Sequence, residues 1–366
     1  MKIKTITCHK VYNYGAILQE YALIAYLKSI GCDAETINYR PYYLSNHFNL
    51  LVVANPKYEK NFIIKMAYLL AKLPQRLLAL QRKKSFDAFE EKYIPSTKVT
   101  YLTNEALKSN IPEADAYICG SDQIWNSFFQ NGKDPAFYLD FVPEKKMKIS
   151  YAASFAIDEV KEELKEFVKG KVSRINHISV RETSGVYILN KLGVKNVVQV
   201  VDPVFLIEKY FWISNFVSQI KEKYIFVYDC DSNIQIRKIV KEAAKKFGLK
   251  IFTVNNNIKY ADKSFYYKGP ETFLSLINNA DFVISNSFHA VAFSLIFQKK
   301  FLVVDRHEQI NTRMRDLMNF LELSHLHLGF NEYKSLEEVS IDYKKVSEIL
   351  NIKILESKNF LNSAIG

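Results

Sequence analysis

The sequence predicts an α/β protein with two doubly wound domains that face each other across a cleft. At 366 residues the chain suits two cores better than one. Short apolar runs alternate with helix-like periods along most of it, a pattern typical of parallel sheets covered by helices. A hydrophobic content of 48% and a charged content of 24% describe an ordinary globular protein and argue against disorder.

The first domain is expected over residues 1–204 and begins with a β-loop-α-β unit. KIKTITC is predicted as a strand, the helix after it ends at Gly31, and AETINY is the next strand. The right-handed crossover rule makes these strands parallel, so the domain is Rossmann-like. Further strands are expected at DAYICG, KISYAASF and HISVRE, a charged helix over 158–176, and an extended linker at Asp202-Pro203.

A basic helical insert is expected over about 41–110. Between residues 61 and 92, leucines and other apolar residues alternate with lysines and arginines such as Lys65, Lys72 and Arg76. We favour a pair of helices that packs on the first domain. The alternative is an amphipathic surface that rests on anionic lipid, where each basic group adds about 1 kcal/mol of binding energy.

The second domain is expected over 205–340. Its strands are predicted at YIFVYD, LKIFTV, DFVIS and FLVVD, with helices between them. Gly248 ends the first of these helices, and Pro270 fits the first turn of the second. Residues 341–366 are expected to form a C-terminal helix that packs back on the first domain.

The charge and cysteine content narrow the choice of partners. A formal net charge of +11 favours an anionic partner, such as a phosphorylated substrate or an anionic lipid surface. The basic residues are dispersed among acids and follow no nucleic-acid motif, so no nucleic-acid partner is expected. Four cysteines without CxxC spacing predict reduced core residues and no metal site. The expected location is the cytoplasm, with the inner face of the membrane as the place for peripheral contact.

Polar side chains follow the predicted strands of the first domain. Ligands bind at the carboxyl ends of parallel strands, so these side chains are candidates for the crevice, with a tryptophan among them as a stacking wall. They are Ser121, Asp122, Trp125 and Asn126. Capping of the next helix explains Asp122 equally well. Arg181 is a candidate anchor for phosphate or carboxylate, and a structural pair with the neighbouring Glu182 is its alternative role.

Three helix or strand ends supply the other candidates. DFVIS gives way to a helix at Ser287, a predicted N-cap, and this places the imidazole of His289 where a helix N-terminus attracts anions. Local capping or packing is the alternative role of His289. Asn13 and Gly15 stand at the entrance of the first helix, where glycine lets a ligand come close. FLVVD delivers Arg306 and His307 beside the His289 loop.

An ordered set of motifs resembles the polysaccharide pyruvyl transferase family, and two facing doubly wound domains resemble the GT-B-like arrangement of sugar-processing transferases. The motifs are T-C-H-x-x-x-N-Y-G-A-x-L-Q from Thr7 to Gln19, I-C-G-S-D-Q-I-W-N from Ile118 to Asn126, S-Y-A-A-S-F from Ser150, S-V-R-E from Ser179, V-D-P-V-F from Val201 and S-N-S-F-H-A from Ser285. The likeness covers residues 1 to about 325. Where better-studied members carry S-x-R-L-H, this chain has Ser287 in place of the arginine, and the histidine carries over as His289.

The resemblance implies transfer of a pyruvyl group from phosphoenolpyruvate to a sugar of a cell-surface glycan or its lipid-linked precursor, forming a ketal without a required metal or other cofactor. In that chemistry His289 would deliver a proton to the methylene carbon, and Asp122 would deprotonate or orient the sugar hydroxyl. Arg181 would hold phosphate or carboxylate, with Arg306 or His307 as second choices. The sugar side would be shaped by Asn13, Gly15, Gln19, Trp125 and Asn126.

Two rival functions share the same fold. One is a glycosyltransferase that uses a nucleotide sugar, although no glycine-rich nucleotide loop followed by a ribose-binding glutamate stands in the second domain. The other is a noncatalytic scaffold that binds glycan or membrane. Loss of the motif arginine permits the scaffold, whereas retention of His289, Arg181 and Asp122 favours an enzyme.

Overall fold

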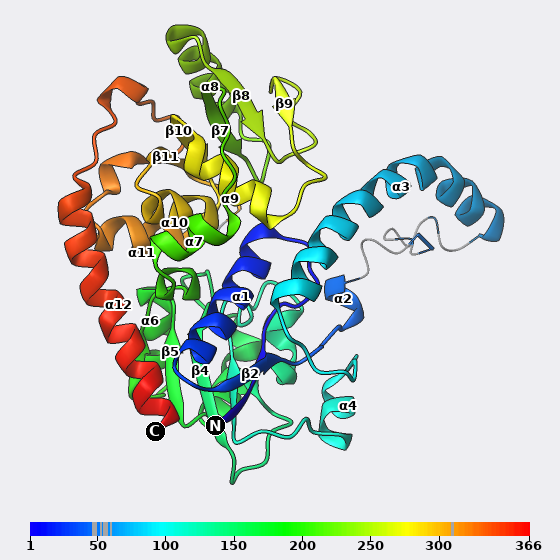
Figure 1. Ribbon diagram of the computed structural model, residues 1–366. Coiled ribbons are helices and arrows are strands. Elements are labelled where there is room, and N and C mark those ends of the chain that lie inside the picture. The colour runs from blue at the N-terminus through cyan, green and yellow to red at the C-terminus, as the bar shows by residue number, and fades with distance from the viewer. Residues whose placement is uncertain (46–49, 52, 54–57, 59–60, 309–310) are drawn as a thin grey trace.

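The computed structural model describes the whole chain except residues 46–49, 52, 54–57, 59–60 and 309–310. The described part contains two six-stranded sheets in which every pair of neighbouring strands is parallel. In Figure 1 the sheet of the first domain lies below that of the second, and helices cover both. The predicted α/β fold with two doubly wound domains is confirmed.

The first sheet has the strand order β2-β1-β3-β4-β5-β6. Its strands are β1 (Lys2–Ile6), β2 (Asp33–Thr36), β3 (Ala116–Cys119), β4 (Met147–Ala153), β5 (His177–Val180) and β6 (Val197–Gln199). The helices of this domain are α1 (Tyr14–Ser29), α2 (Tyr42–Ser45), α3 (Phe62–Tyr93), α4 (Asn104–Ser109), α5 (Lys165–Val172) and α6 (Thr183–Lys191), with the short 3-10 turns η3 (Asn131–Lys133), η4 (Pro135–Tyr138), η5 (Glu162–Leu164) and η6 (Pro203–Leu206). The charged helix predicted over 158–176 is shorter, because its first turn is η5.

The second sheet has the strand order β12-β11-β10-β7-β8-β9. Its strands are β7 (Tyr224–Tyr228), β8 (Lys250–Thr253), β9 (Lys263–Ser264), β10 (Phe282–Ser285), β11 (Lys300–Val304) and β12 (His327–Leu328). The helices are α7 (Lys209–Phe216), α8 (Ile234–Phe247), α9 (Pro270–Asn279), α10 (Phe288–Ile296), α11 (Thr312–Phe320) and α12 (Tyr343–Ile365), with the turns η7 (Ser324–Leu326) and η8 (Leu336–Glu338). As predicted, Gly248 ends α8 in a left-handed conformation and Pro270 begins α9.

Helix α1 is buried on nearly all sides between the two domains. It begins at Tyr14 because the side chain of Asn13 accepts hydrogen bonds from the backbone N–H groups of Gly15 and Ala16. The helix carries apolar residues all round, as a buried helix does, and it packs against η6, α9 and α10. The Tyr14 ring stacks on Phe273 of the second domain with centroids 4.7 Å apart. The two domains therefore share a core around α1.

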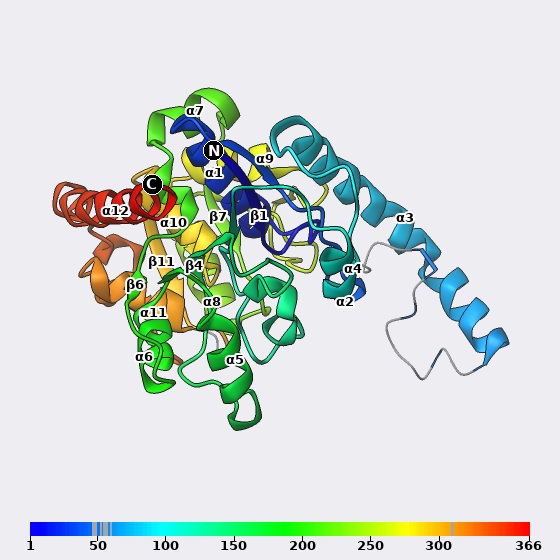
Figure 2. The same ribbon diagram turned by 90° about the horizontal axis from the view of Figure 1, so that it is seen from below.

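Residues Phe62–Tyr93 of the predicted insert form one long helix, so the expectation of a helical pair packed on the first domain is wrong. Helix α3 runs for 32 residues, and Asn61 caps its start. Figures 1 and 2 show its first half projecting away from the body and its second half lying against α1 and the second domain. Phe86 and Phe89, in the second half, are each 1% exposed. No helix in the described residues is apolar enough over a sufficient length to cross a bilayer.

Arg82 joins α3 to both domains. Its Nη1 donates to the Tyr14 hydroxyl at 2.9 Å and to the Tyr266 carbonyl at 2.7 Å, and its Nη2 donates to the Tyr12 carbonyl at 3.1 Å. The guanidinium also lies over the rings of Tyr14, Phe86 and Tyr266, with distances of 4.6 to 4.8 Å to their centroids. Buried hydrogen bonds of this kind fix where the second half of α3 sits.

Helix α12 crosses from the second domain back to the first. Near its start the Tyr343 hydroxyl donates to the backbone carbonyl of Ser294 in the second domain. Further along, the Ser357 hydroxyl accepts from the backbone N–H of Val201 at 3.0 Å, and Tyr26 of α1 donates to Asn362 at 3.4 Å. The chain thus connects the domains twice, through η6 and through α12.

Replacement of Arg82 by methionine is expected to destabilise the protein by about 2–3 kcal/mol. The substitution leaves the partly buried carbonyls of Tyr12 and Tyr266 without their donor and removes the charge that three rings surround. Urea denaturation measures the effect, and the matched control is Lys84→Met, an exposed position on the same helix. Equal stability of the two variants would show that Arg82 does not hold α3 in place.

Candidate functional site

Five ionisable side chains from both domains meet between the two sheets. Asp122, Arg181 and Asp202 follow β3, β5 and β6 at the carboxyl edge of the first sheet, while His289 and Arg313 belong to the first turns of α10 and α11 in the second domain. We call these five residues the charge cluster. Each of its side chains is at least four-fifths buried. The carboxyl edge of a parallel sheet is where α/β proteins bind ligands, so the cluster is the candidate site.

The charge cluster is linked by a chain of ion pairs. Arg181 Nη1 donates to Asp202 Oδ2, and its Nη2 lies 3.3 Å from Asp122 Oδ1. Arg313 Nη1 lies 3.2 Å from the same Asp122 oxygen, so one carboxylate oxygen is shared by a guanidinium from each domain. His289 Nε2 lies 3.4 Å from Asp202 Oδ2, which allows attraction between charges although the two groups are not aligned for a hydrogen bond. These contacts place an imidazole beside two guanidinium groups.

The two carboxyl groups stay ionised in spite of burial. Burial raises the pKa of Asp202, but His289 and Arg181 lower it more, so it ends well below its usual range. The pKa of Asp122 also ends lower, because Arg181, Arg313 and His289 outweigh burial and the repulsion of Asp202. The pKa of Arg313 falls to about 10, first through burial and then through repulsion by Arg181. Arg313 shares the Asp122 carboxylate with Arg181, so its positive charge is only partly compensated. A bound anion next to Arg313 would complete the compensation.

Several polar atoms in this region make no hydrogen bond within the described part of the chain. They are Nε of Arg181, Arg306 and Arg313, Nε2 of His289 and Oε2 of Glu182. A buried donor without an acceptor costs roughly 1–3 kcal/mol, and such atoms in folded proteins often mark a functional site. Four of these five atoms belong to side chains that carry or accept positive charge, so the fitting ligand is an anion.

The aromatic ring of Phe288 supports both arginines. The guanidinium carbon of Arg181 lies 4.7 Å from the ring centroid and that of Arg313 lies 5.6 Å from it. The ring of His289 meets the same phenyl ring edge to face at 5.3 Å. Phe288 therefore fixes the relative positions of the three cationic or basic groups.

Gly15 gives the His289 ring the space it occupies. A Cβ atom at Gly15 would lie 1.9 Å from Nδ1 of His289 and 2.5 Å from its Cγ. The first turn of α1 thus touches the imidazole directly, and any side chain at position 15 would displace it. Gly15 was predicted to let a ligand come close, and the group that lies against it in this structure is the His289 ring.

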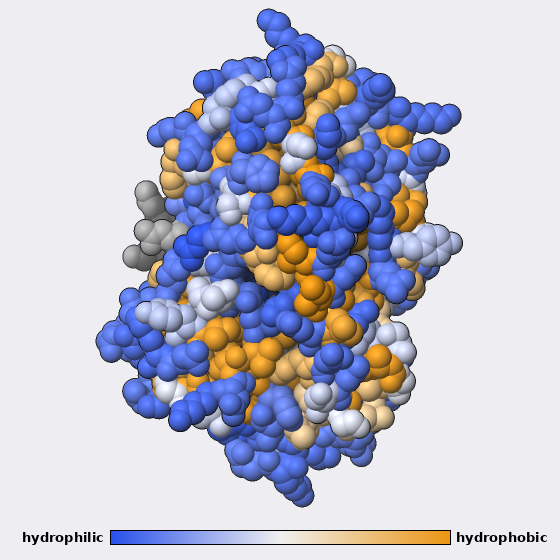
Figure 3. Space-filling model, turned by 90° about the vertical axis from the view of Figure 1, so that its left-hand side faces the viewer, coloured by the Kyte–Doolittle hydropathy of each residue, from blue (hydrophilic) through white to orange (hydrophobic). Residues whose placement is uncertain are grey.

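The space within the charge cluster is small. The cavity that Arg181, Asp202, Phe288 and Arg313 line measures about 30 Å³, which is room for water but well below the roughly 300 Å³ of ordinary ligand pockets. A larger cavity of about 540 Å³ lies between the domains. Residues of both domains line it: Phe128, Ile157, Asp158, Glu159, Asp305, Asn311, Thr312, Arg315 and His327. Figure 3 shows the molecule hollowed at the waist between its upper and lower halves, on the side that carries α11 and α12.

The structure brings three predicted residues together and adds two that the sequence did not mark. His289, Asp122 and Arg181 lie in the charge cluster, and Arg181 pairs with aspartates rather than mainly with Glu182, whose Oε2 is 4.0 Å away. Asp202 was expected only as part of an extended linker. Its backbone is extended, but its side chain also caps η6 through the N–H of Val204. Arg313 had no sequence signal, because TRMRDLM follows an unremarkable loop.

Four residues predicted to line the crevice are instead buried in the first domain. Trp125 is fully buried, stacks on Tyr138 and donates to the carbonyl of Phe137, so it forms no stacking wall. The Ser121 hydroxyl donates to a backbone carbonyl, and the amide of Asn126 closes its own loop. Gln19 accepts a hydrogen bond from the N–H of Ser121. These side chains fix the loop after β3, which holds Asp122 in a left-handed conformation with φ of 71°.

The remaining candidates lie around the charge cluster. Asn13 caps α1, whereas Ser287 occupies the N-cap position of α10 without a capping hydrogen bond from its side chain. Arg306 donates to Glu308 at 2.8 Å. His307 pairs with Asp231 at 2.8 Å, and its side chain is 59% exposed, so it lies apart from the buried groups.

Comparisons with known proteins agree with this architecture. A family model described as polysaccharide pyruvyl transferase matches residues 13–308, which contain His289, Asp122, Arg181 and Asp202. No curated protein matches the chain. A UDP-N-acetylglucosamine 2-epimerase from Rickettsia bellii superposes with a TM-score of 0.51 at 11% identity, covering 99% of this chain and 98% of its own. The heptosyltransferase WaaC of E. coli superposes with a TM-score of 0.39 at 13% identity, covering 96% and 99%. At 11% identity the likeness to the epimerase concerns the fold alone, which is GT-B-like.

Replacement of Gly15 by alanine is expected to push the His289 ring out of place and to destabilise the protein by about 1–3 kcal/mol. Imidazole resonances in a nitrogen-15 NMR spectrum report the displacement, and urea denaturation reports the stability. The control is Gly170→Ala in α5, where a new Cβ meets nothing within 4 Å. Unchanged imidazole resonances in Gly15→Ala would contradict the contact.

Asp202 is expected to stabilise the folded protein at neutral pH and to lose this stabilising effect in acid. Its pKa in the folded protein is lowered from the usual value of about 3.9, so its contribution is complete above about pH 4 and is lost as the pH falls through the folded pKa. Asp202→Asn should be less stable than wild type at pH 7 and should lose less on acidification to pH 3, as urea denaturation would measure. The control is Asp33→Asn, at an exposed position on β2. Parallel pH profiles of wild type and Asp202→Asn would refute this role.

Proposed function

The chain belongs to the polysaccharide pyruvyl transferase family, and from that membership we propose that it moves a pyruvyl group from phosphoenolpyruvate to sugar hydroxyls, forming a ketal. Membership makes it a transferase that acts on polysaccharides. The observation that supports phosphoenolpyruvate as donor is the charge cluster itself, where two guanidinium groups with unused Nε donors stand beside His289. The acceptor we propose is a sugar of a cell-surface glycan or its lipid-linked precursor, met at the cytoplasmic face of the membrane.

Arg313 supplies the guanidinium that the motif around His289 lacks. Ser287 stands where the motif carries arginine, but Arg313 reaches the ring of the next residue, Phe288, from α11. Together with Arg181 it can bind the phosphate and the carboxylate of phosphoenolpyruvate, since guanidinium groups pair with both in a bidentate way. Arg306 is a third donor, because its Nε is also unpaired among the described residues. The two carboxylates of the charge cluster already balance its two guanidinium groups, so the dianion would take the place of Asp122 beside them.

The chemistry assigns a separate step to each side chain. His289 gives the proton on Nε2 to the methylene carbon of the enol phosphate, while one sugar oxygen bonds to the adjacent carbon and its proton passes to the imidazole, which is thereby restored. A second hydroxyl oxygen then bonds to that carbon as the bond between the carbon and the phosphate oxygen breaks. The phosphate leaves with the electron pair and takes up the proton of the second hydroxyl. The lowered pKa of Asp122 makes it a weak base, so orienting the hydroxyl suits it better than deprotonation. Asp202 orients the imidazole and balances its charge when it is protonated.

Substrate entry requires the domains to move. A cavity of about 30 Å³ cannot hold phosphoenolpyruvate, so the ion pairs that Asp122 makes with Arg181 and Arg313 must open for the donor to replace them. The larger cavity between the domains is the proposed acceptor site, because Phe128 can stack on a sugar ring and Asp158 and Asp305 can accept from its hydroxyls. It adjoins the charge cluster through α11, since Thr312 and Arg315 line it on either side of Arg313 in sequence.

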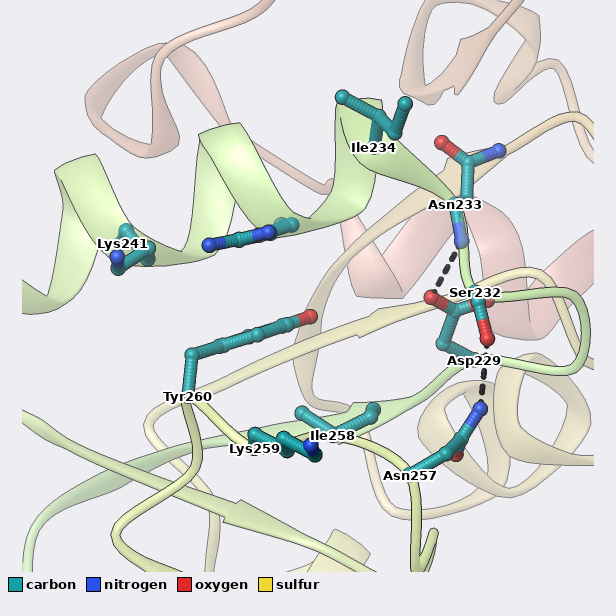
Figure 4. Close-up of a pocket in the computed structure, with 10 residues that line it drawn as sticks. Asp229, Ser232, Asn233, Ile234, Lys241, Asn257, Ile258, Lys259 and Tyr260 are labelled. Carbon is teal, nitrogen blue, oxygen red and sulfur yellow. Dashed lines mark hydrogen bonds between the residues drawn. The ribbon is translucent and has the colours of Figure 1, made fainter.

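Another cavity, in the second domain, supports the alternative function, which is glycosyl transfer from a nucleotide sugar. It measures about 450 Å³ and lies at the carboxyl ends of β7 and β8 and at the start of α8. Figure 4 shows the Tyr260 ring reaching across it toward α8, with Asp229 and Ser232 near its other end. The guanidinium of Arg237 lies 5.9 Å from the centroid of that ring. A stacking ring beside basic groups and a helix N-terminus suits a nucleotide.

Binding measurements with two variants separate these functions. Calorimetric and thermal-shift titrations with phosphoenolpyruvate should show binding that Arg313→Met weakens by about tenfold or more, because a hydrogen bond to a charged group is lost. Arg237→Met, in the other cavity, should leave that binding unchanged. Binding of a nucleotide sugar that only Arg237→Met weakens would support glycosyl transfer instead. Binding of neither ligand would favour a noncatalytic scaffold.

Replacement of His289 by asparagine is expected to preserve phosphoenolpyruvate binding and to lower turnover by about 10²–10⁴-fold, the usual contribution of general acid catalysis. Turnover is measured as phosphate release in the presence of a panel of sugar acceptors. A folding control is the thermal midpoint of the variant, which should stay near that of wild type. Phosphate release at the wild-type rate by His289→Asn would remove His289 from the mechanism.

A further inference from the structure

The first half of α3, residues 62–78, is an arm with an exposed apolar surface. Figure 1 shows it extending away from both domains, and Figure 2 shows the same from below. Leu69 is buried, but eight other large apolar side chains of the arm are between 37% and 77% exposed, which is unusual for a monomeric globular protein. They are Phe62, Ile63, Ile64, Met66, Leu70, Leu73, Leu77 and Leu78.

Five of these side chains form one stripe along the arm. Ile63, Met66, Leu70, Leu73 and Leu77 follow each other at intervals of three and four residues, so they lie on one face of the helix. The arm is about 25 Å long at 1.5 Å per residue. In the described part of the chain, Arg82 and Ser85 of the second half of α3 bind both domains, while the five stripe residues of the first half stay between 37% and 76% exposed.

The charges of α3 are all positive over its first 25 residues. No aspartate or glutamate occurs from Phe62 to Phe86, whereas six lysines and arginines do. Those of the arm are Lys65, Lys72 and Arg76, at intervals of seven and four residues, so they form a second row about 110° round the helix from the apolar stripe. An apolar stripe flanked by basic side chains is the pattern of a helix that lies in a membrane interface.

The arm, residues 62–78, contains no aspartate or glutamate, and this composition favours an anionic partner. A second copy of the chain, packed stripe to stripe, would bring two rows of lysines and arginines together, and neither helix has a carboxylate of its own between Phe62 and Phe86. An anionic bilayer matches both features, because its acyl region takes the apolar stripe and its headgroups attract the basic row. We therefore propose that the arm docks in the interface of an anionic membrane.

The residues of α3 that follow the arm connect it to both domains. Arg82 and Ser85 bind the carbonyls of Tyr266 and Tyr267 in the second domain at 2.7 Å each, and Arg82 also binds Tyr12 before α1. An arm in the membrane therefore holds both domains in one orientation relative to the bilayer. This docking stands independently of the proposed function, since it rests on the surface of α3 and not on the charge cluster.

Vesicle sedimentation with the full chain tests the docking. Wild type should bind vesicles of phosphatidylcholine mixed with phosphatidylglycerol more tightly than vesicles of phosphatidylcholine alone, and added salt should weaken the binding. The double variant L70E/L73E places two acids in the stripe and should bind anionic vesicles at least about tenfold more weakly. K72E keeps the stripe and should lose most of the preference for anionic lipid.

The matched control is I352E/L355E on α12, where two apolar side chains are 64% and 60% exposed but stand apart from the arm. This variant should bind vesicles as wild type does. The thermal midpoints of all variants should stay close to that of wild type, because the replaced side chains are exposed. Light scattering at several protein concentrations tests for self-association in the same samples.

Three results would overturn the proposal. The first is no binding of wild type to anionic vesicles, and the second is equal binding by L70E/L73E and wild type. The third is a wild-type protein that does not bind vesicles but forms a dimer, which L70E/L73E abolishes. The last result would assign the stripe to a second copy of the chain. Calorimetry with phosphoenolpyruvate in the absence of vesicles reads the proposed function separately, so failure of one idea does not conceal failure of the other.

Discussion

The buried pairing of Arg181 with two aspartates is the interaction on which this structure depends. Charges removed from water are costly unless each is compensated, and a lone guanidinium between the domains would be strongly destabilising. Asp202 and Asp122 provide the compensation from the ends of two other strands, and Asp122 passes it on to Arg313 in the second domain. The domains therefore cannot separate without exposing or rearranging these charges, so the same contacts that close the cleft are those that a bound anion can replace.

Close packing around α1 sets the other condition for the site. The helix is buried between the sheets, and the glycine in its first turn allows the His289 ring to touch the backbone. Asn13 fixes where that turn begins, and Tyr14 anchors it against Phe273. The imidazole is thus positioned by packing from the first domain and by Asp202, while its own backbone belongs to the second. A catalytic role for His289 would rest on atoms from both domains.

The strands and most helices could be predicted from the sequence because apolar periodicity, glycine stops and proline starts act locally. The same reasoning placed Asp122 and Arg181 at strand ends of the first domain and His289 at the start of a helix in the second. It missed Asp202 and Arg313, because their importance comes from a meeting of distant elements that no local pattern records. It misplaced Trp125, since a polar run after a strand looks the same whether its aromatic residue faces a crevice or the core. The arm of α3 was misjudged for a related reason: an apolar helical period predicts burial, and only the structure shows which face lacks a partner.

The chain crosses between the domains at η6 and at α12, and Ser357 of α12 accepts a hydrogen bond from the N–H of Val201 just before η6. Arg82 and Ser85 of α3 join the domains at a separate place, through the carbonyls of Tyr266 and Tyr267. A domain movement about the two crossings that opens the charge cluster would have to break these two hydrogen bonds. A force applied to α3 would therefore reach the cleft through Arg82 and Ser85.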